Sequence, residues 1–136
     1  MRVVLDTNIL VSALLKPAGL ESTILLLALR GRFELWVTPA ILAEYAEVLG
    51  RPRLKIDPVA SGAAMAAIRK VCHVVHPTRR LSISRDEPDN RFYECADAAQ
   101  AHYLVTGNAR HFRVRQGATE IVTTRQFIAA SIARGD

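Results

Sequence analysis

The start of the chain is the feature that most limits which folds this sequence can adopt. Arg2–Leu5 (RVVL) is a short apolar segment, and Asp6 follows it directly. An apolar strand of this kind is typical of a parallel sheet that is covered on both faces. Because open α/β folds bind ligands at the carboxyl ends of their strands, we expect Asp6 at that edge, where it can hold a divalent cation. The alternative is that Asp6 only caps the helix that follows.

Segments of strand length alternate with helical segments along the rest of the chain. After 2–6, strands are predicted at 34–38, 71–75, 102–106 and 120–123, and helices at 8–15, 20–30, 40–49, 58–70, 89–101 and 125–133. This alternation favours the α/β class, with a parallel sheet and helices on both of its faces. Since no segment has the length of a linker, we expect residues 1–136 to form one domain.

The composition argues against a membrane or secreted protein. Half of the residues are hydrophobic, yet no apolar run approaches the roughly 18 residues of a transmembrane helix. The N-terminus does not resemble a signal peptide, because Asp6 interrupts the apolar segment at once. Cys72 and Cys95 are isolated in apolar surroundings and are expected to be buried thiols. We therefore expect a cytoplasmic protein.

Arginine dominates the charge of the chain. There are 18 Lys and Arg against 13 Asp and Glu, which gives a formal net charge of +5. Because Arg presents a planar fork of donors to phosphate groups, this composition favours a polyanionic partner. A high content of Arg and Ala is also typical of a GC-rich genome, and that explanation stays open.

Carboxylates gather at three places in the sequence. Besides Asp6, Glu44 lies within the apolar segment 41–46, where an unpartnered charge is costly to bury. The third group surrounds the predicted helix start at 89 and consists of Asp86, Glu87, Asp89, Glu94 and Asp97. The alternatives are a Glu44 at the edge of an amphipathic face and an Asp89 that serves only as a helix cap.

Convergence of Asp6, Glu44 and Asp89 would point to a metal site. Three carboxylates repel one another unless protons or divalent cations neutralise them. Oxygen ligands without Cys or His select Mg²⁺ or Mn²⁺. Such an ion beside an Arg-rich surface is suited to the hydrolysis of phosphodiesters.

Four motifs make the chain resemble a known family. They are Leu5–Leu10 (LDTNIL), Glu44, Asp86–Ala96 (DEPDNRFYECA) and Tyr103–Asn108 (YLVTGN), in the order and at about the spacing of a PIN domain. The resemblance covers nearly the whole chain and is strongest to the toxin components of bacterial toxin–antitoxin pairs (VapC-like proteins). It implies a three-layer α/β/α sandwich with a mainly parallel sheet of about five strands. It also implies an Mg²⁺- or Mn²⁺-dependent ribonuclease with RNA as its substrate and an antitoxin as its partner.

The resemblance assigns roles to individual residues. Asp6, Glu44 and Asp89 match the catalytic, metal-binding carboxylates of the family. Asn8 matches the residue that braces the first acid by hydrogen bonding, and Thr106 matches the hydroxyl residue that ends the fourth strand.

The sequence departs from the family pattern at Asn108. Many PIN domains have Asp at this position, whereas Asn offers an oxygen ligand without a charge. Three carboxylates are enough for one ion but hold a second only with help from phosphate. Asp97 and Glu94 rank below the main three as compensating acids.

Basic residues fall into two sets near the carboxylates. One set comes after the fourth strand and comprises Arg110, His111, Arg113 and Arg115. The other set brackets the polar segment before the fifth helix and comprises Arg79, Arg80, Arg85 and Arg91. The principal candidates for RNA binding are Arg110, His111, Arg113, Arg85 and Arg91. The alternative for either set is solvated loop charge.

Other functions stay open at this point. Asn108 favours a PIN-like module that binds RNA or protein without cutting. A phosphatase of the haloacid-dehalogenase type would need Asp in place of Asn8, and a receiver domain would need Asp where His76 and Pro77 follow the third strand. Leu20–Leu29, with Leu and Ile at helical spacing, is expected to be core, or else a homodimer or antitoxin surface.

Overall fold

The computed structural model folds around a five-stranded sheet and describes residues 1–108, 112, 114–115 and 117–134. The strand order is β3-β2-β1-β4-β5, and all four pairings are parallel. The strands are β1 (Arg2–Leu5), β2 (Glu34–Val37), β3 (His73–Val74), β4 (Tyr103–Val105) and β5 (Glu120–Val122). The predicted parallel sheet of about five strands is confirmed.

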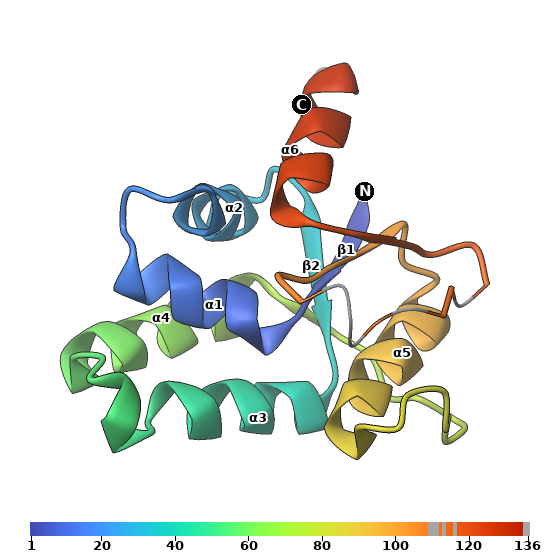
Figure 1. The fold of residues 1–136 in the computed structure, drawn as a ribbon, viewed down its shortest axis with the longest axis horizontal. Helices are drawn as coiled ribbons and strands as arrows, with labels where there is room; N and C mark the ends of the chain where they lie inside the picture. Colours follow the sequence, from blue (N-terminus) through green and yellow to red (C-terminus); the bar gives the residue numbers. More distant parts are fainter. Residues whose placement is uncertain (109–111, 113, 116, 135–136) are drawn as a thin grey trace.

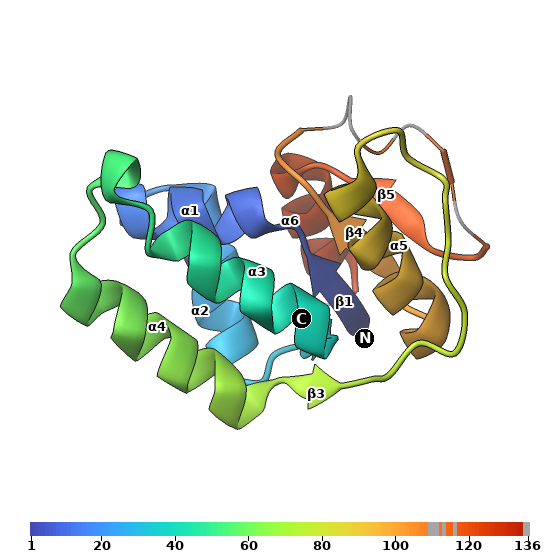
Figure 2. The same ribbon diagram turned by 90° about the horizontal axis from the view of Figure 1, so that it is seen from below.

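Helices cover both faces of the sheet and complete a three-layer α/β/α sandwich (Figure 1). The helices are α1 (Thr7–Leu15), α2 (Leu20–Leu29), α3 (Pro39–Leu49), the 3₁₀ turn η1 (Pro52–Leu54), α4 (Pro58–Val71), α5 (Glu87–Ala99) and α6 (Thr124–Ala133). α5 packs on β1, β2 and β4, whereas α6 packs on β4 and β5 and contacts α2. Figure 2 shows α5 and α6 on opposite sides of β4.

The central strand β1 is the most buried part of the sheet. Val3, Val4 and Leu5 have no exposed surface, because β1 has a neighbour on each side and helices above and below. From β1 the chain builds β2 and β3 on one side, and then returns to build β4 and β5 on the other. The order therefore reverses at the carboxyl ends of β1 and β4, the place where open α/β sheets bind ligands.

The two cysteines and α2 contribute to the core much as predicted. Cys95 is buried, Cys72 is half-buried, and both are free thiols. In α2, Ile24, Leu25 and Ala28 are buried in the core, while the side chains of Leu20 and Leu26 stay exposed.

No single helix among the described residues is long and apolar enough to cross a membrane. α1 and α2 meet the criteria of length and composition only as a pair, and the pair is bent by 109°.

The largest differences from the predicted boundaries lie in the third strand and at the start of the fifth helix, each for a local reason. The third strand covers only His73–Val74 instead of 71–75, because α4 continues through Val71. The fifth helix begins at Glu87, earlier than the predicted cap at Asp89 or Asn90. Pro88 fits the first helical turn, where its fixed φ suits the helix and its missing N–H is not needed.

Asn90 ties the segment before α5 to the first turn of that helix. Its side chain is completely buried. The amide oxygen accepts hydrogen bonds from Ile83 N (3.0 Å) and Ser84 N (2.7 Å), and the amide nitrogen donates to Ser84 O (3.1 Å) and Glu87 Oε2 (3.0 Å). Both N–H donors and both lone pairs of this amide are thus engaged within the protein. Asn90 therefore acts as a clamp, in the sense that its hydrogen bonds hold the loop before α5 in place, and it does not act as a helix cap.

Replacing Asn90 by Ala should release this loop. The change leaves the partly buried amides of Ile83 and Ser84 without acceptors, at a cost of about 1–3 kcal/mol in the free energy of unfolding. Hydrogen exchange should show lost protection at these two amides. Ser82→Ala, an exposed change in the same loop, serves as the control. Unchanged protection of both amides in Asn90→Ala would contradict the clamp.

Candidate active site

Asp6 lies at the carboxyl end of β1, beside the end of β4. Its backbone N–H donates to Val105 O (2.9 Å), and its Oδ2 accepts a hydrogen bond from the hydroxyl of Thr106 (2.7 Å). Asp6 occupies the N-cap position of α1, yet its side chain makes no capping hydrogen bond. The cap alone therefore does not account for this carboxylate, which is only 8% exposed.

Thr106 is the residue that orients Asp6. It is fully buried after β4, and its hydroxyl donates to Asp6 while accepting a hydrogen bond from the backbone N–H of Asn108 (3.0 Å). With its acceptor side occupied by this N–H, the hydroxyl proton is directed at the carboxylate. One side chain thus connects the acid on β1 to the turn that follows β4.

Asn8 braces a different group from the one expected. Its Oδ1 accepts a hydrogen bond from the backbone N–H of Gly107 (3.1 Å). Asn8 lies one residue into α1, so its side chain reaches across to the turn after β4, while Thr106 supplies the hydrogen bond to Asp6. The predicted brace on Asp6 is corrected accordingly: Asn8 holds the turn that begins at Gly107.

Glu44 lies in α3 and is held next to the same strand end. The hydroxyl of Thr7, the residue after Asp6, donates a short hydrogen bond to Glu44 Oε2. The buried phenol of Tyr45 donates to Leu5 O (2.6 Å), the carbonyl that directly precedes Asp6. These two contacts join α3 to the junction of β1 and α1. By contrast, Glu47 points outward and pairs with Arg51 (2.8 Å).

Asp89 lies in the first turn of α5 and is 7% exposed. Its charge acts on Asp6, because the pKa of Asp6 is raised from 3.8 to about 6. Burial is the largest cause of that rise, the hydrogen bond from Thr106 opposes it, and the charges of Asp89 and Glu44 add to it. The structure therefore brings Asp6, Glu44 and Asp89 close enough for their charges to interact.

The chemistry of these side chains fits a hard divalent cation. Asp6, Glu44 and Asp89 offer only oxygen ligands, which suit Mg²⁺ or Mn²⁺. A cation would also relieve the burial and repulsion that raise the pKa of Asp6. However, no group of three or more His, Cys, Asp or Glu side chains among the described residues stands close enough together to hold an ion. The three acids would have to draw closer around one.

The two lesser acids are engaged elsewhere on α5. Glu94 is 5% exposed, accepts a hydrogen bond from Leu81 N (2.9 Å), and pairs with Arg91 (3.0 Å). Asp97 forms a two-pronged pair with Arg79, at 3.1 Å and 3.0 Å. Both carboxylates thus anchor arginines and the loop before α5, and neither is brought to Asp6 as a compensating acid.

The arginines expected to bind RNA fall into three groups. The Arg91 side chain is 15% exposed and its guanidinium pairs with Glu87 (2.6 Å) and Glu94, and its contact with RNA stays a prediction. Arg85 and Arg115 are exposed. Arg110, His111 and Arg113 lie outside the described residues.

Thr7, Tyr45 and Asn90 are residues of the site region whose roles sequence reasoning missed. Thr7 lies between Asp6 and Asn8 in the sequence, and this position could have indicated a role beside Asp6. Tyr45 follows Glu44 in an apolar segment and looks like ordinary core. Its bond to Leu5 O joins residues 40 positions apart, which no local pattern reveals.

The raised pKa of Asp6 predicts a pH-dependent effect of Asp6→Asn in metal-free protein. Between pH 3.8 and about 6 the folded state holds a proton that the unfolded state releases, so wild-type stability falls as pH rises through this range. Asn carries no ionisable proton, so the Asp6→Asn variant does not lose stability in this way. The variant should be more stable than wild type by about 1–3 kcal/mol near pH 8, with the difference shrinking below about pH 4.

Urea unfolding in EDTA across this pH range measures the effect. Glu47→Gln, a change at an exposed carboxylate of α3, is the control and should show no comparable gain. An Asp6→Asn variant that is not stabilised near pH 8 would show that Asp6 is not a strained, buried carboxylate.

Comparisons with known proteins agree with this geometry. A family model described as PIN domain matches residues 2–110. An uncharacterized protein of Methanocaldococcus jannaschii, MJ1680, is 29% identical over 111 residues, which cover 79% of this chain and 71% of that protein. The crystal structure of VapBC2 from Rickettsia felis bound to a DNA fragment from its promoter contains a chain with the same fold. The TM-score is 0.61 at 19% identity, covering 90% of this chain and 99% of that one.

The family match covers most of the chain and includes Asp6, Glu44, Asp89 and Thr106. The protein belongs to the PIN domain family.

Proposed function

We propose that the protein is a metal-dependent endoribonuclease. The observation that carries this proposal is the buried Asp6, whose pKa is raised by burial and by the charges of Asp89 and Glu44. A protein gains nothing in stability from such an arrangement, which is typical of a functional site. Membership in the PIN family and the Arg-rich composition support RNA as the polyanion.

Each residue of the site has a distinct part in this proposal. Asp6, Glu44 and Asp89 would hold the ion, which when bound stabilises charge on the phosphoryl group and promotes attack by water. Thr106 and Thr7 keep the carboxylates of Asp6 and Glu44 oriented through their hydrogen bonds. These hydrogen bonds fix the orientation of each carboxylate, and the three acids would draw closer around the ion. With Asn108 uncharged, we expect a single ion.

Cleavage of a structured RNA should require Mg²⁺ or Mn²⁺ and stop in EDTA. Asp6→Asn, Asp89→Asn and Glu44→Gln should each lower the rate by about 100-fold or more, because each removes a charged ligand. Glu47→Gln is the matched control for Glu44→Gln, since it makes the same change one turn away on the exposed side of α3. Equal loss in both variants, or cleavage that survives EDTA, would contradict the proposed site.

We further propose that the protein is the toxin of a toxin–antitoxin pair and is held inactive by a partner protein. The fold shared with a chain of the Rickettsia felis VapBC2 complex supports this role. Induced expression in a bacterial host should arrest growth, and Asp6→Asn should relieve the arrest at equal protein level. Arrest by the Asp6→Asn protein would show that any toxicity is independent of the site. A homodimer stays a prediction.

A second candidate function is a PIN-like module that binds RNA without cutting it. Two observations favour it. Asn108 lacks a charge, and the carboxylates among the described residues do not lie close enough together to hold a metal ion. This module would bind RNA in EDTA and would yield no product with either ion. The cleavage experiment above separates it from the nuclease.

A further inference from the structure

A pocket of about 340 Å³ lies on the β2 side of the candidate active site. It is lined by Thr38, Pro39 and Ala40 at the start of α3, by Pro77, Thr78, Arg79 and Arg80 after β3, and by Arg91 and Glu94 of α5. We call it the Arg80 pocket. Its walls come from three segments that are distant in sequence, and none of the three main acids lines it.

The Arg80 pocket opens at the same edge of the sheet as Asp6. In the register of β1 and β2, Arg2 pairs with Glu34 and Val3 with Leu35. Continuing this register places Thr38 beside Asp6, with the strands about 4.8 Å apart. Pro77 follows β3, the next strand along. A nucleic acid strand crossing the edge from Asp6 toward β3 would therefore pass over this pocket.

The lining of the pocket holds three arginines and one carboxylate, Glu94, which is engaged by Arg91 and by Leu81 N. Because Arg79 and Arg91 are paired with carboxylates at short distance, Arg80 carries the least neutralised positive charge of the three. The first turn of α3, an 11-residue helix, adds the partial positive charge of a helix N-terminus. Two threonines and three apolar residues form the rest of the lining, and the apolar residues, Pro39, Ala40 and Pro77, suit the sugar of a nucleotide better than a second charge.

The three arginines differ in how firmly they are held. Arg79 and Arg91 are fixed by carboxylates at 2.6–3.1 Å, so they form a preorganised wall. Arg80 has 74% of its side chain exposed, and its ion pair with Glu87 is long, at 3.9 Å. Such an exposed pair contributes little, so Arg80 can turn to a ligand at small cost.

We propose that the Arg80 pocket binds a phosphodiester group of the RNA strand next to the bond that is cut, with Arg80 as the contact that closes on it. This inference rests on the proposed function for the identity of the strand. It assigns one phosphate contact to the β2–β3 side of the edge.

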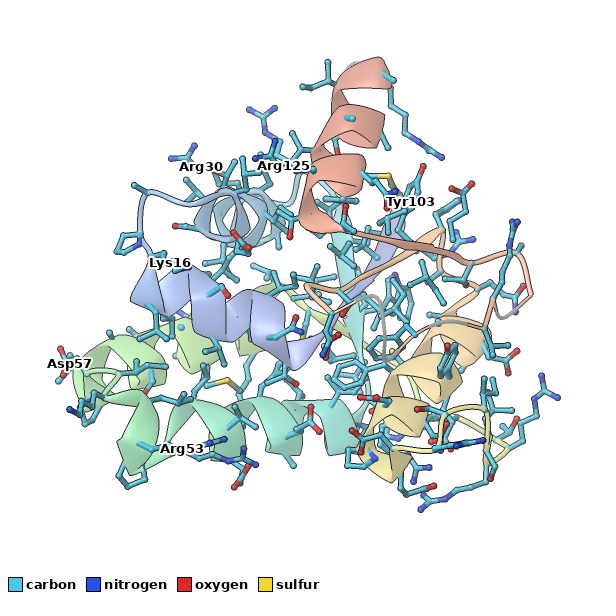
Figure 3. The ribbon with its side chains drawn as sticks, in the orientation of Figure 1. Lys16, Arg30, Arg53, Asp57, Tyr103 and Arg125 are labelled. Atoms are coloured by element: carbon cyan, nitrogen blue, oxygen red, sulfur yellow. The ribbon has the colours of Figure 1, made fainter. Side chains whose placement is uncertain are left out.

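The test measures RNA binding without catalysis. A labelled single-stranded oligouridylate is titrated with wild-type protein, Arg80→Ala and Arg53→Ala in EDTA. Arg53 is the control, because it is an exposed arginine in η1, at the far end of α3 from the pocket (Figure 3). Arg80→Ala should weaken binding by about five- to tenfold, as expected for one charged hydrogen bond, and Arg53→Ala by less than about twofold.

Salt dependence and the bases provide two further readouts. Loss of one phosphate contact should lower the slope of log K against log salt by about 0.7 in Arg80→Ala only. An abasic ribose–phosphate strand should show the same dependence on Arg80. Equal effects of Arg80→Ala and Arg53→Ala, or an Arg80 effect that vanishes with the abasic strand, would overturn the proposal. Absence of metal-dependent cleavage by wild-type protein would instead contradict the proposed function and leave these binding results intact.

Discussion

Parallel pairing of β1 with β2 on one side and β4 on the other is the constraint on which the structure depends. Parallel strands all end at one edge, so the residues that follow β1, β2 and β4 meet there regardless of their distance in sequence. Asp6 and Thr106 are 100 positions apart, yet their side chains are 2.7 Å apart. The same pairing buries Val3, Val4 and Leu5 of β1 and leaves the carboxylate at the end of the strand poorly solvated.

That buried carboxylate determines the electrostatics of the site. In a structural ion pair, a buried arginine or lysine would neutralise such a carboxylate. The hydrogen-bond donor to Asp6 is instead a neutral group, the hydroxyl of Thr106. The charges of Asp89 and Glu44 then raise the pKa of Asp6 further instead of lowering it. An arrangement of this kind is stabilised by a cation and is costly without one. It favours the nuclease over the binding module, although the acids must still gather around the ion.

Whereas the partner of Asp6 is a neutral hydroxyl, most of the arginines near α5 already have carboxylate partners. Arg79 pairs with Asp97, and Arg91 pairs with Glu87 and Glu94. The net charge of +5 therefore does not translate into a uniformly free basic surface. The Arg79–Asp97 pair, together with Asn90, holds the segment before α5 against the helix whose first turn carries Asp89. Arg80 is the least engaged member of the group that lines a pocket.

The sequence by itself determined the class of fold and the parallel sheet, and it singled out Asp6, Glu44 and Asp89 as candidate site residues, because strand-length apolar segments and the residues near their ends are local features. Only the tertiary structure decided the partners: Thr106 for Asp6, Gly107 for Asn8, Thr7 for Glu44, and Arg79 for Asp97. Hydrogen bonds and ion pairs depend on which elements pack side by side, and a side chain's choice among several nearby partners leaves no periodic signal in the chain.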